Sequence, residues 1–493
     1  MTASTPPVRG LHLQFGADAA REVVVSWWTP DPVTAPRCTI RTRDGAATTH
    51  AASTRSYADA RSGRTVHAHH VSFTGLEPAT RYEFVAEHDG AAPEHGDWLT
   101  GPAGRAALSF TAFGDQGVPM DPVEAERLGL PGVGGGLGAP EAAGATAGVE
   151  SLRPLFHVPA GDLAYANLAP DRVETWARYF DHTSTSARHR PWMPVPGNHE
   201  NEHGNGRFGY DAYRTFYALP HASGHTDDTR GLWYAFTAGS VRIVGIHTDD
   251  FAIQHAGDDV IHDYSRGAQL AWLREELGTT RADPDIDWVI VVGHQLCIST
   301  ADRANGADLG LRRVLLPLCA EFDVDLVIGG HDHHYERSHP VLGGADNETC
   351  TPVVAATRLD EIDATAGTVH LLVGSGGTSA PTHERMTTPP RCRVITDVTL
   401  TDDRWGRRLP VHVWEDAPWS ASRNLAHPFG FVQVTVDPGD RPGGLTRLTV
   451  TFHEVHDAAG TLREFETFTL VRPRSDAPTS GSAARRLPAR APA

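Results

Sequence analysis

Five short motifs in this sequence carry side chains that can bind metal ions. In chain order they are Gly114-Asp115-Gln116-Gly117, Gly161-Asp162-Leu163-Ala164-Tyr165, Gly197-Asn198-His199-Glu200, Val291-Val292-Gly293-His294 and Gly330-His331-Asp332-His333. Carboxylate and phenolate oxygens suit a hard ion such as ferric iron, whereas imidazole and amide groups suit a softer divalent ion. The set therefore predicts a site for two unlike metals.

Each motif taken alone also has an ordinary structural interpretation. A Gly-Asp pair after a strand is a common turn, so Asp115 alone is more often a capping residue than a ligand. A single histidine is more often a hydrogen-bonded core residue, but His331 and His333 lie two apart after a strand and point to the same side. Because every motif follows an apolar strand, we expect all five to meet at one rim.

The elements that must position these motifs are apolar strands alternating with helices, which is typical of an α/β layer architecture. Strands are predicted at residues 108–113, 155–159, 241–246, 288–292, 325–328 and 369–373, and a second sheet is completed by 429–436, 446–452 and 464–471. Leucines at helical spacing predict one helix capped by Ser265 and another around residues 309–318.

The first hundred residues have a different pattern. Short strands predicted at 11–15, 22–28 and 82–86 are separated by turn residues, which favours a β-sandwich. Trp27 and Trp28 are expected in its core or at a domain contact. The segment from Leu76 to Tyr82 resembles the tyrosine corner of fibronectin type III domains, in which the tyrosine hydroxyl bonds to nearby backbone.

Composition and charge exclude several classes of function. A chain of 493 residues exceeds what one hydrophobic core usually organises, so two domains are expected. The sequence contains no run of about 18 apolar residues, the length that a membrane-spanning helix needs. The net charge of −18 opposes attraction to nucleic acid or anionic lipid, so we expect neither as a partner. Five scattered cysteines leave disulfide bridges and free thiols both open.

Taken in order, the five motifs resemble those of the metallophosphoesterase superfamily, and Tyr165 makes the chain resemble the purple acid phosphatases. The segment Gly330 to Arg337 is similar to the last metal motif of that family with its Tyr-Glu-Arg extension. Residues 8–30 resemble actinobacterial members. The resemblance covers nearly the whole chain. It implies a fibronectin type III-like domain at 8–102, then an α/β metallophosphoesterase domain at 105–473 with two mixed sheets flanked by helices.

The resemblance also implies ligand roles. Ferric iron would be held by Asp115, Asp162, Tyr165 and His333, and a divalent zinc, iron or manganese ion by Asp162, Asn198, His294 and His331. Asp162 would then bridge both metals. A free tyrosine ionises near pH ~10, so its binding as phenolate needs the charge of ferric iron, and a visible charge-transfer band should result.

The expected activity is hydrolysis of small phosphate monoesters in mildly acidic solution, with a metal-bound hydroxide as nucleophile. His199 adjoins the ligand position Asn198, so it is predicted to bind phosphate and protonate the leaving oxygen. Glu200 either orients His199 or is a surface carboxylate. Relatives from plants and animals often carry further substrate-binding histidines after the position of His294, where this chain has Gln295. The histidines considered as substitutes, none of them assigned a role, are His203, His247 and His334.

Other functions stay open at this point. A phosphodiesterase or nucleotide pyrophosphatase would use the same scaffold. A non-catalytic binding protein is disfavoured because no metal-ligand position is lost. The sequence leaves the physiological substrate and the oligomeric state open. The resemblance implies a secreted or envelope protein, but the N-terminus shows no signal-peptide pattern, so a cytoplasmic location also stays open.

Two segments are predicted to lack regular structure. The Gly/Ala-rich stretch 131–148 is expected to be a surface loop, with a mobile flap near the site as the alternative. Residues 474–493, rich in Pro, Ala, Ser and Arg, are expected to form a disordered tail.

Overall fold

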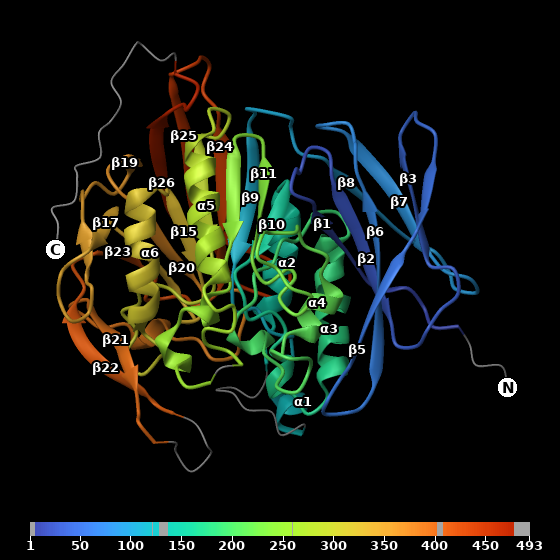
Figure 1. Cartoon of the computed structure of the whole chain (residues 1–493), viewed down its shortest axis with the longest axis horizontal. Helices are drawn as coiled ribbons and strands as arrows, with labels where there is room; N and C mark the ends of the chain where they lie inside the picture. The colour runs from blue at the N-terminus through green and yellow to red at the C-terminus, as the bar shows by residue number, and fades with distance from the viewer. Residues whose placement is uncertain (1–4, 121, 128–136, 259, 402–407, 478–493) are drawn as a thin grey trace.

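Two four-stranded antiparallel sheets make up the N-terminal part of the chain (Figure 1). The structure is a computed structural model that describes residues 5–120, 122–127, 137–258, 260–401 and 408–477. One sheet has the order β1-β2-β6-β5 and the other β4-β3-β7-β8. The strands are β1 Arg9–Phe15, β2 Val23–Thr29, β3 Arg37–Thr42, β4 Thr48–Ala51, β5 Ser53–Ala58, β6 Thr65–Phe73, β7 Arg81–Glu87 and β8 Glu94–Leu99.

The predicted strand pattern holds in this sandwich. In β7, Tyr82, Phe84 and Ala86 are buried while Glu83 between them is exposed, as expected for a strand with one face toward a core. The backbone N–H of Glu77 donates to the Tyr82 hydroxyl at 3.0 Å. The tyrosine-corner contact predicted from the sequence is therefore present.

Two mixed sheets form the second part of the chain. The six-stranded sheet has the order β10-β9-β24-β25-β26-β19 and the seven-stranded sheet the order β11-β12-β13-β15-β20-β16-β23. Their strands are β9 Leu108–Phe113, β10 Phe156–Pro159, β11 Tyr234–Ala238, β12 Val241–Gly245, β13 Trp288–Val292, β15 Leu326–Gly329, β16 Tyr335–Ser338, β19 Glu361–Asp363, β20 Val369–Val373, β23 Ser420–Arg423, β24 Gly430–Asp437, β25 Leu445–Val455 and β26 Leu462–Pro473. An all-β domain followed by an α/β domain with two mixed sheets is the predicted fold class.

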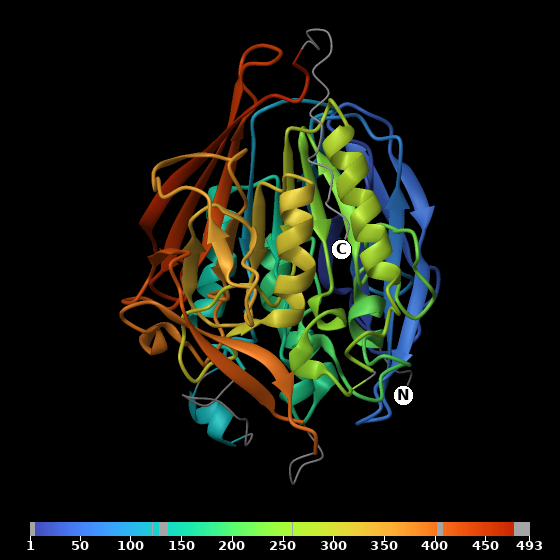
Figure 2. The ribbon, with the colours of Figure 1, turned by 60° about the vertical axis from the view of Figure 1, so that its left-hand side comes forward.

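The central strands of the seven-stranded sheet are buried on both faces. All five side chains of β13 are buried, and β12, β13, β15 and β20 run parallel to one another. Continuous apolar runs are typical of parallel strands covered on both faces. Figure 2 shows α5 and α6 lying over one of these faces.

The described helices flank the two sheets. They are α1 Pro122–Arg127, α2 Glu141–Leu152, α3 Arg172–Ala187, α4 Asp211–Phe216, α5 Ala268–Ala282 and α6 Leu309–Glu321, with short 3-10 turns η1 Ala166–Leu168, η2 Asn198–Glu200, η3 Thr248–Asp250, η4 Ile253–His255 and η5 His383–Arg385. The two predicted helices correspond to α5 and α6. Ser265 was predicted to be the cap of α5, but that helix follows Gly267, and the Ser265 hydroxyl accepts only from the Gln269 N–H at 3.3 Å.

Three shorter strand groups complete the second part. Strands β14 Ala307–Asp308, β21 Arg391–Val398 and β22 Pro410–Asp416 form one sheet, and β17 Val341–Gly344 pairs with β18 Pro352–Val354. All five cysteines are free thiols. Within the described ranges, no helix is both long and apolar enough to cross a membrane.

The prediction of a loop over 131–148 was wrong for its second half. Residues 141–148 lie in α2, and the first residues of the stretch, 131–136, fall outside the described ranges. A Cβ on Gly144 would stand 2.0 Å from the Asp457 carbonyl oxygen, and one on Gly148 would stand 2.8 Å from the Phe431 ring. The small residues are therefore an adaptation to close packing rather than a mark of disorder.

The first residues of the predicted disordered tail are held against the α/β part. The Arg474 guanidinium pairs with Asp476, and the N–H of Ser475 donates to the Asp287 carboxylate at 2.8 Å. Residues 474–476 are therefore fixed to the α/β part. Residues 478–493 of the predicted tail lie outside the described residues.

The sandwich packs on the α/β part through the C-terminal end of α4. Trp27 and Trp28 are buried as predicted, and the Trp28 ring meets Phe216 edge-on with centroids 6.2 Å apart. Two buried histidines of the sandwich reach the last turn of α4. The ring Nε2 of His12 lies 3.0 Å from the Phe216 carbonyl oxygen, and the Nε2 of His70 lies 2.9 Å from that of Thr215. The sandwich thus places imidazole nitrogens beside helix carbonyls at the end of α4, where intrahelical partners run out.

Candidate metal centre

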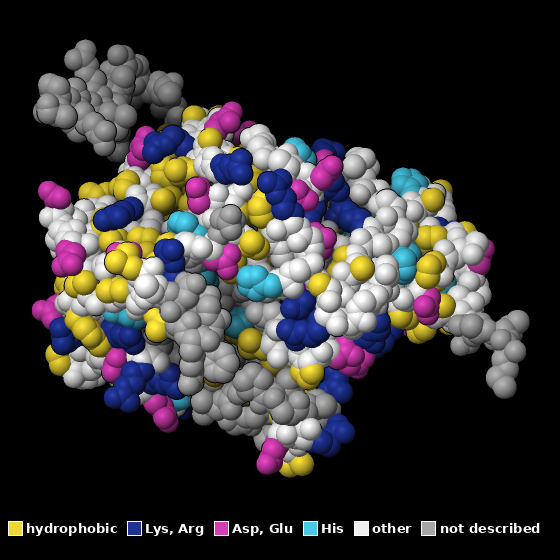
Figure 3. All heavy atoms as spheres, turned by 60° about the horizontal axis from the view of Figure 1, so that its bottom comes forward, with side chains coloured by type: hydrophobic (Ala, Val, Ile, Leu, Met, Phe, Trp, Pro, Cys, Tyr) yellow, Lys and Arg dark blue, Asp and Glu magenta, His cyan; other side chains and the backbone are white. Residues whose placement is uncertain are grey.

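The predicted ligands come from the ends of strands in both mixed sheets. Asp115 follows β9, and Asp162 and Tyr165 follow β10 in the six-stranded sheet. His294 follows β13, and His331 and His333 follow β15 in the seven-stranded sheet. Asn198 lies in η2, just after a segment that bridges to β10 through Val195 and Ala160. Figure 3 views the end of the molecule toward which β9 runs in Figure 1, and histidine side chains are visible near its middle.

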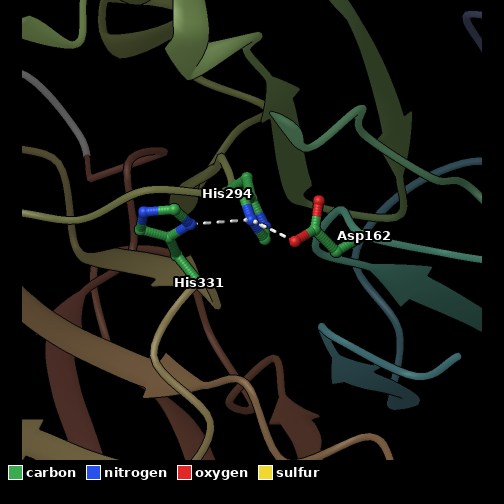
Figure 4. A group of neighbouring side chains, drawn as sticks. All are labelled: Asp162, His294 and His331. Atoms are coloured by element: carbon green, nitrogen blue, oxygen red, sulfur yellow. Dashed lines mark hydrogen bonds and ion pairs between the residues drawn. The ribbon is translucent and has the colours of Figure 1, made fainter. Parts of the chain in front are cut away.

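Four of the predicted ligands form one group, in which the other three surround the ring of His294. Its Nε2 lies 3.0 Å from Asp162 Oδ2, 3.1 Å from Asn198 Oδ1 and 3.2 Å from His331 Nδ1. Asp162, His294 and His331 are buried, and their ligand atoms lie within 4.8 Å of one another. Figure 4 shows these three side chains pointing toward one another.

The other three predicted ligands form a second group beside the first. Asp115 Oδ1 lies 3.1 Å from the Tyr165 hydroxyl and 3.3 Å from His333 Nε2, and the last two atoms are 3.4 Å apart. The backbone N–H of His331 donates to Asp115 Oδ2 at 2.8 Å, so the two groups adjoin. The structure therefore brings together all seven residues singled out from the sequence.

The tautomers of His294 and His333 leave a lone pair facing each group. His294 Nδ1 lies 2.9 Å from the Ala160 carbonyl oxygen, and His333 Nδ1 lies 2.6 Å from that of Ala380. Because a carbonyl oxygen only accepts, each Nδ1 carries the hydrogen and each Nε2 is left without one in the neutral ring. Fixing one ring nitrogen in this way is typical of metal-binding histidines.

The surroundings of His294 Nε2 fit a cation. The three atoms within 3.2 Å of it are Asp162 Oδ2, Asn198 Oδ1 and His331 Nδ1, two of which can only accept hydrogen bonds. Burial lowers the pKa of His294, but the Asp162 and Asp115 carboxylates outweigh burial and raise it to about 10. The two carboxylates thus favour a positive charge at this position. A metal ion would supply the same positive charge.

Tyr165 also fits a site that holds a cation. Its side chain is buried, and burial together with the Asp115 and Asp162 carboxylates raises the pKa of Tyr165 well above its usual value. Two carboxylates beside a buried phenol are unfavourable for a phenolate unless a strong positive charge is present. The oxygen-rich group around Tyr165 therefore fits the harder of two metals.

Four of the seven residues have a left-handed backbone. The φ angles are +58° for Asp115, +54° for Asp162 and Tyr165, and +75° for His331. Such a conformation costs about 1–3 kcal/mol per residue without glycine and is found mainly at functional sites. No sequence pattern predicted these conformations, although aspartate and histidine are residue types that adopt this region more often than most, whereas tyrosine is not.

Glu200 has neither of the two roles considered for it. It is buried, so it is not a surface carboxylate, and its oxygens accept from the backbone N–H groups of Gly197, Asp162 and Leu163 at 2.7–2.9 Å. Glu200 therefore joins the loop after β10 to the loop that carries Asn198. It holds the backbone around two predicted ligands rather than orienting the His199 ring.

His199 lies beside both groups of ligands. Its Nε2 is 4.0 Å from Asp162 Oδ2, and its ring lies against that of Tyr165 with centroids 4.6 Å apart. Its Nδ1 is 3.0 Å from Asn167 Oδ1. Burial lowers the pKa of His199, against the opposing effect of the Asp162 carboxylate. The ring thus presents Nε2 to the centre while Asn167 holds the other nitrogen.

The sequence missed two side chains that hold site residues in place. Asn167 contacts His199, and the Gln254 amide lies 3.1–3.2 Å from His331 Nε2. Both stand in 3-10 turns without a motif. The only signal was that Asn167 follows Tyr165 by two residues.

The three other histidines considered for substrate binding have different surroundings. His203 is exposed. His247 is buried with Nδ1 2.7 Å from the Tyr264 hydroxyl, and His334 is buried with Nδ1 2.8 Å from the Thr382 hydroxyl. None of the three has a described contact with the seven predicted ligands.

Comparisons with known proteins agree with this geometry. The family model described as purple acid phosphatase, N-terminal domain, matches residues 8–100, and that for calcineurin-like phosphoesterases matches residues 144–335. An uncharacterized protein of Mycobacterium tuberculosis is 49% identical over 474 residues, which covers 96% of this chain and 88% of that protein.

More distant relatives have named activities. Purple acid phosphatase 1 of Ipomoea batatas is 28% identical over 239 residues, which is 46% of this chain and 45% of that protein. The structure of a purple acid phosphatase from yellow lupin superposes with a TM-score of 0.67 at 18% identity and covers 96% of this chain and 76% of that one. At that identity the superposition shows the fold alone.

Proposed function

This chain belongs to the purple acid phosphatase family, and we propose that it hydrolyses small phosphate monoesters at a two-metal centre. A phosphoester hydrolase is what the family supports. The observation that carries the proposal is the convergence of seven oxygen and nitrogen ligands in two adjoining groups. A candidate acid, His199, lies beside both.

We assign the two groups to two metals. Asp115, Tyr165 and His333 would hold ferric iron, because a buried phenol and a carboxylate suit a hard ion. Asn198, His294 and His331 would hold a divalent zinc, iron or manganese ion, and Asp162 would serve both metals. When bound, such a pair supplies a nucleophile near neutral pH and neutralises charge on the phosphoryl group.

The protein's own residues contribute proton transfer and orientation. His199 would protonate the departing oxygen from Nε2, which faces the centre, while Asn167 holds Nδ1. Glu200 holds the backbone of Asp162 close to that of Gly197. This arrangement maintains the hydrogen bond of 2.8 Å that the His199 N–H donates to the Asp162 carboxylate. Preorganised groups of this kind act without rearrangement during the reaction.

Monoesterase activity is tested by comparing two substrates. We expect a higher kcat/KM for nitrophenyl phosphate than for bis(nitrophenyl) phosphate, with an optimum in mildly acidic solution. Elemental analysis of the same sample should give two metal ions per chain, one of them iron. A preference for the diester would assign the site to phosphodiester hydrolysis instead, and protein free of metal yet fully active would remove the two-metal mechanism.

A further inference from the structure

We infer that the N-terminal sandwich positions His199, through the loop between β5 and β6. That loop spans residues 59–64, and its first five residues, 59–63, are called the docking loop below; they lie more than a hundred residues before His199 in the chain. The inference rests on the proposed function, because it concerns the proton donor of that reaction. Three sets of direct contacts connect this loop to the His199 ring.

The first contact holds the imidazole ring. Asn167 Oδ1 lies 3.0 Å from His199 Nδ1, and the only hydrogen-bonding group on the opposite side of that ring is Nε2. An amide oxygen beside Nδ1 accepts its hydrogen, which fixes the plane of the ring. The direction in which Nε2 points therefore depends on where Asn167 is held.

The second contact holds Asn167. This residue is in the middle of the 3-10 turn η1, which starts directly after Tyr165. The Arg61 guanidinium donates to the carbonyl oxygens of Asn167, at 3.2 Å, and of Ala169. A planar guanidinium that bonds two carbonyls of one turn fixes both its position and its orientation.

The third set of contacts holds the docking loop itself. The N–H of Ala60 donates to Asn205 Oδ1 at 2.7 Å, and Asn205 Nδ2 donates to the buried Asp59 carboxylate at 3.3 Å. The Arg172 guanidinium lies 3.4 Å from the same carboxylate. The docking loop is thus fastened to the segment that follows Glu200 and to the start of α3. Figure 1 shows β5 beside these elements.

These contacts make the sandwich part of the proton-transfer apparatus. Arg61 is a positioning residue, since it touches the turn that carries Asn167 and not the substrate. Arg64 provides a matched control. It lies just past the docking loop and pairs with Asp171, whose carboxylate caps α3 by accepting from the Glu174 N–H at 2.9 Å. Arg64 therefore also crosses between the two parts of the chain, without touching η1.

The test uses the full-length, metal-loaded protein and three variants, Arg61→Ala, Arg61→Lys and Arg64→Ala. Rates are measured for phosphate monoesters with leaving groups from alkyl alcohols to nitrophenol. For Arg61→Ala we expect kcat for alkyl phosphates to fall about tenfold and kcat for nitrophenyl phosphate to change much less, because misplacing the acid matters most for poor leaving groups. Arg61→Lys should recover part of the loss, and Arg64→Ala should match the wild type.

Metal content and melting temperature are measured on the same samples. Unchanged values together with a steeper dependence on leaving-group pKa in Arg61→Ala would support the inference, since a general loss of stability would lower all rates alike. Equal losses for all leaving groups, or the same change in Arg64→Ala, would overturn it.

A structural measurement separates this inference from the proposed function. In crystals of Arg61→Ala, the η1 turn and the His199 ring should be displaced or disordered, whereas crystals of Arg64→Ala should keep both in place. A wild type without monoesterase activity would refute the proposed function, and the crystals would still test the positioning. An undisturbed His199 ring in Arg61→Ala would refute the positioning alone.

Discussion

The side chain of Gln254 lies against the outer nitrogen of the His331 ring. The amide is 3.1–3.2 Å from His331 Nε2, while His331 Nδ1 is 3.2 Å from His294 Nε2 on the opposite side of the ring. The amide nitrogen lies 3.1 Å and the amide oxygen 3.2 Å from this ring nitrogen, and the amide nitrogen is also 3.1 Å from His255 Nε2. With the oxygen as the partner of His331, the hydrogen lies on Nε2 and Nδ1 is free to bind a metal. Gln254 therefore selects the nitrogen that His331 presents to the centre.

Replacing Gln254 should weaken the binding of the divalent ion, which is assigned to His331. For Gln254→Leu we expect roughly a 10- to 100-fold loss of divalent-ion affinity, the usual effect of removing a partner of a metal-binding histidine. Isothermal titration of metal into stripped protein measures it. Gln254→Glu keeps an acceptor and serves as the control. Equal affinities for wild type and Gln254→Leu would show that the contact does not orient the ring.

Tyr165 should give the loaded protein its colour. As-isolated protein is expected to be pink to purple, and Tyr165→Phe should bleach the visible band, because the band needs a phenolate on ferric iron. Tyr57→Phe is the control, since the Tyr57 hydroxyl is buried in the sandwich and has no hydrogen-bond partner among the described residues. Active, colourless protein lacking iron would refute the ferric assignment and leave the two-metal proposal intact.

Asp162 is expected to bind both metal ions, whereas Asn198 is expected to bind only the divalent one. Asp162→Asn is expected to empty or disorder both metal positions, whereas Asn198→Ala should mainly weaken the divalent ion, and excess metal should then restore part of the turnover. Elemental analysis before and after dialysis distinguishes the two variants. Retention of two metals and near-normal rates in both would show that the ligand assignment is wrong.

His199 should act on the leaving group rather than on a metal. His199→Ala is expected to keep both metals and to lose ~10²- to 10⁴-fold in rate on alkyl phosphates, which is what general-acid help is worth, with a smaller loss on nitrophenyl phosphate. The measurement is kcat against leaving-group pKa. Similar losses on both kinds of substrate would indicate a phosphate-binding role, and lost metal would indicate a ligand.

Glu202 should make stability depend on pH. Burial raises the pKa of Glu202 from 4.5 to about 7, although its oxygens accept from Trp176 at 2.7 Å and Asn205 at 2.5 Å. The folded state therefore holds this proton more tightly than the unfolded state, so this group's contribution to stability falls as pH rises from 4.5 to 7.

The variant Glu202→Gln isolates that contribution. Its free energy of unfolding, measured by denaturant titration, should rise relative to the wild type by up to about 3 kcal/mol between those two pH values. Glu275→Gln, on the outside of α5, should show no such trend. Parallel curves for wild type and Glu202→Gln would mean that Glu202 stays ionised throughout.

The sequence was sufficient to locate the strands and to place the predicted ligands that follow them. Apolar runs such as β13 can be recognised as strands from the sequence alone. A residue placed directly after such a run, as His294 is, must lie at the end of the sheet. Arg61, Asn167 and Gln254 could not be found this way. Their roles come from contacts between segments far apart in the chain, which no local pattern records.

Burial and backbone shape were the other unpredictable parts. A glutamate after Asn-His looks like a surface residue, and only the fold shows that Glu200 accepts three backbone hydrogen bonds. In the same way, the glycines of α2 suggested a loop because composition carries no information about the neighbouring backbone, which approaches closely at Gly144.

The way the sandwich meets α4 bears on how this chain can be divided. His12 and His70 serve the carbonyl oxygens of Phe216 and Thr215, and Trp28 covers the Phe216 ring. Separating the two parts between β8 and β9 would expose the apolar surface around Phe216 to solvent. It would also leave the carbonyl groups of Thr215 and Phe216 with water as their only hydrogen-bond partner. The α/β part is therefore not an independent module that can be transplanted or shuffled, and any chimera that exchanges the sandwich must also carry a matching surface for the last turn of α4.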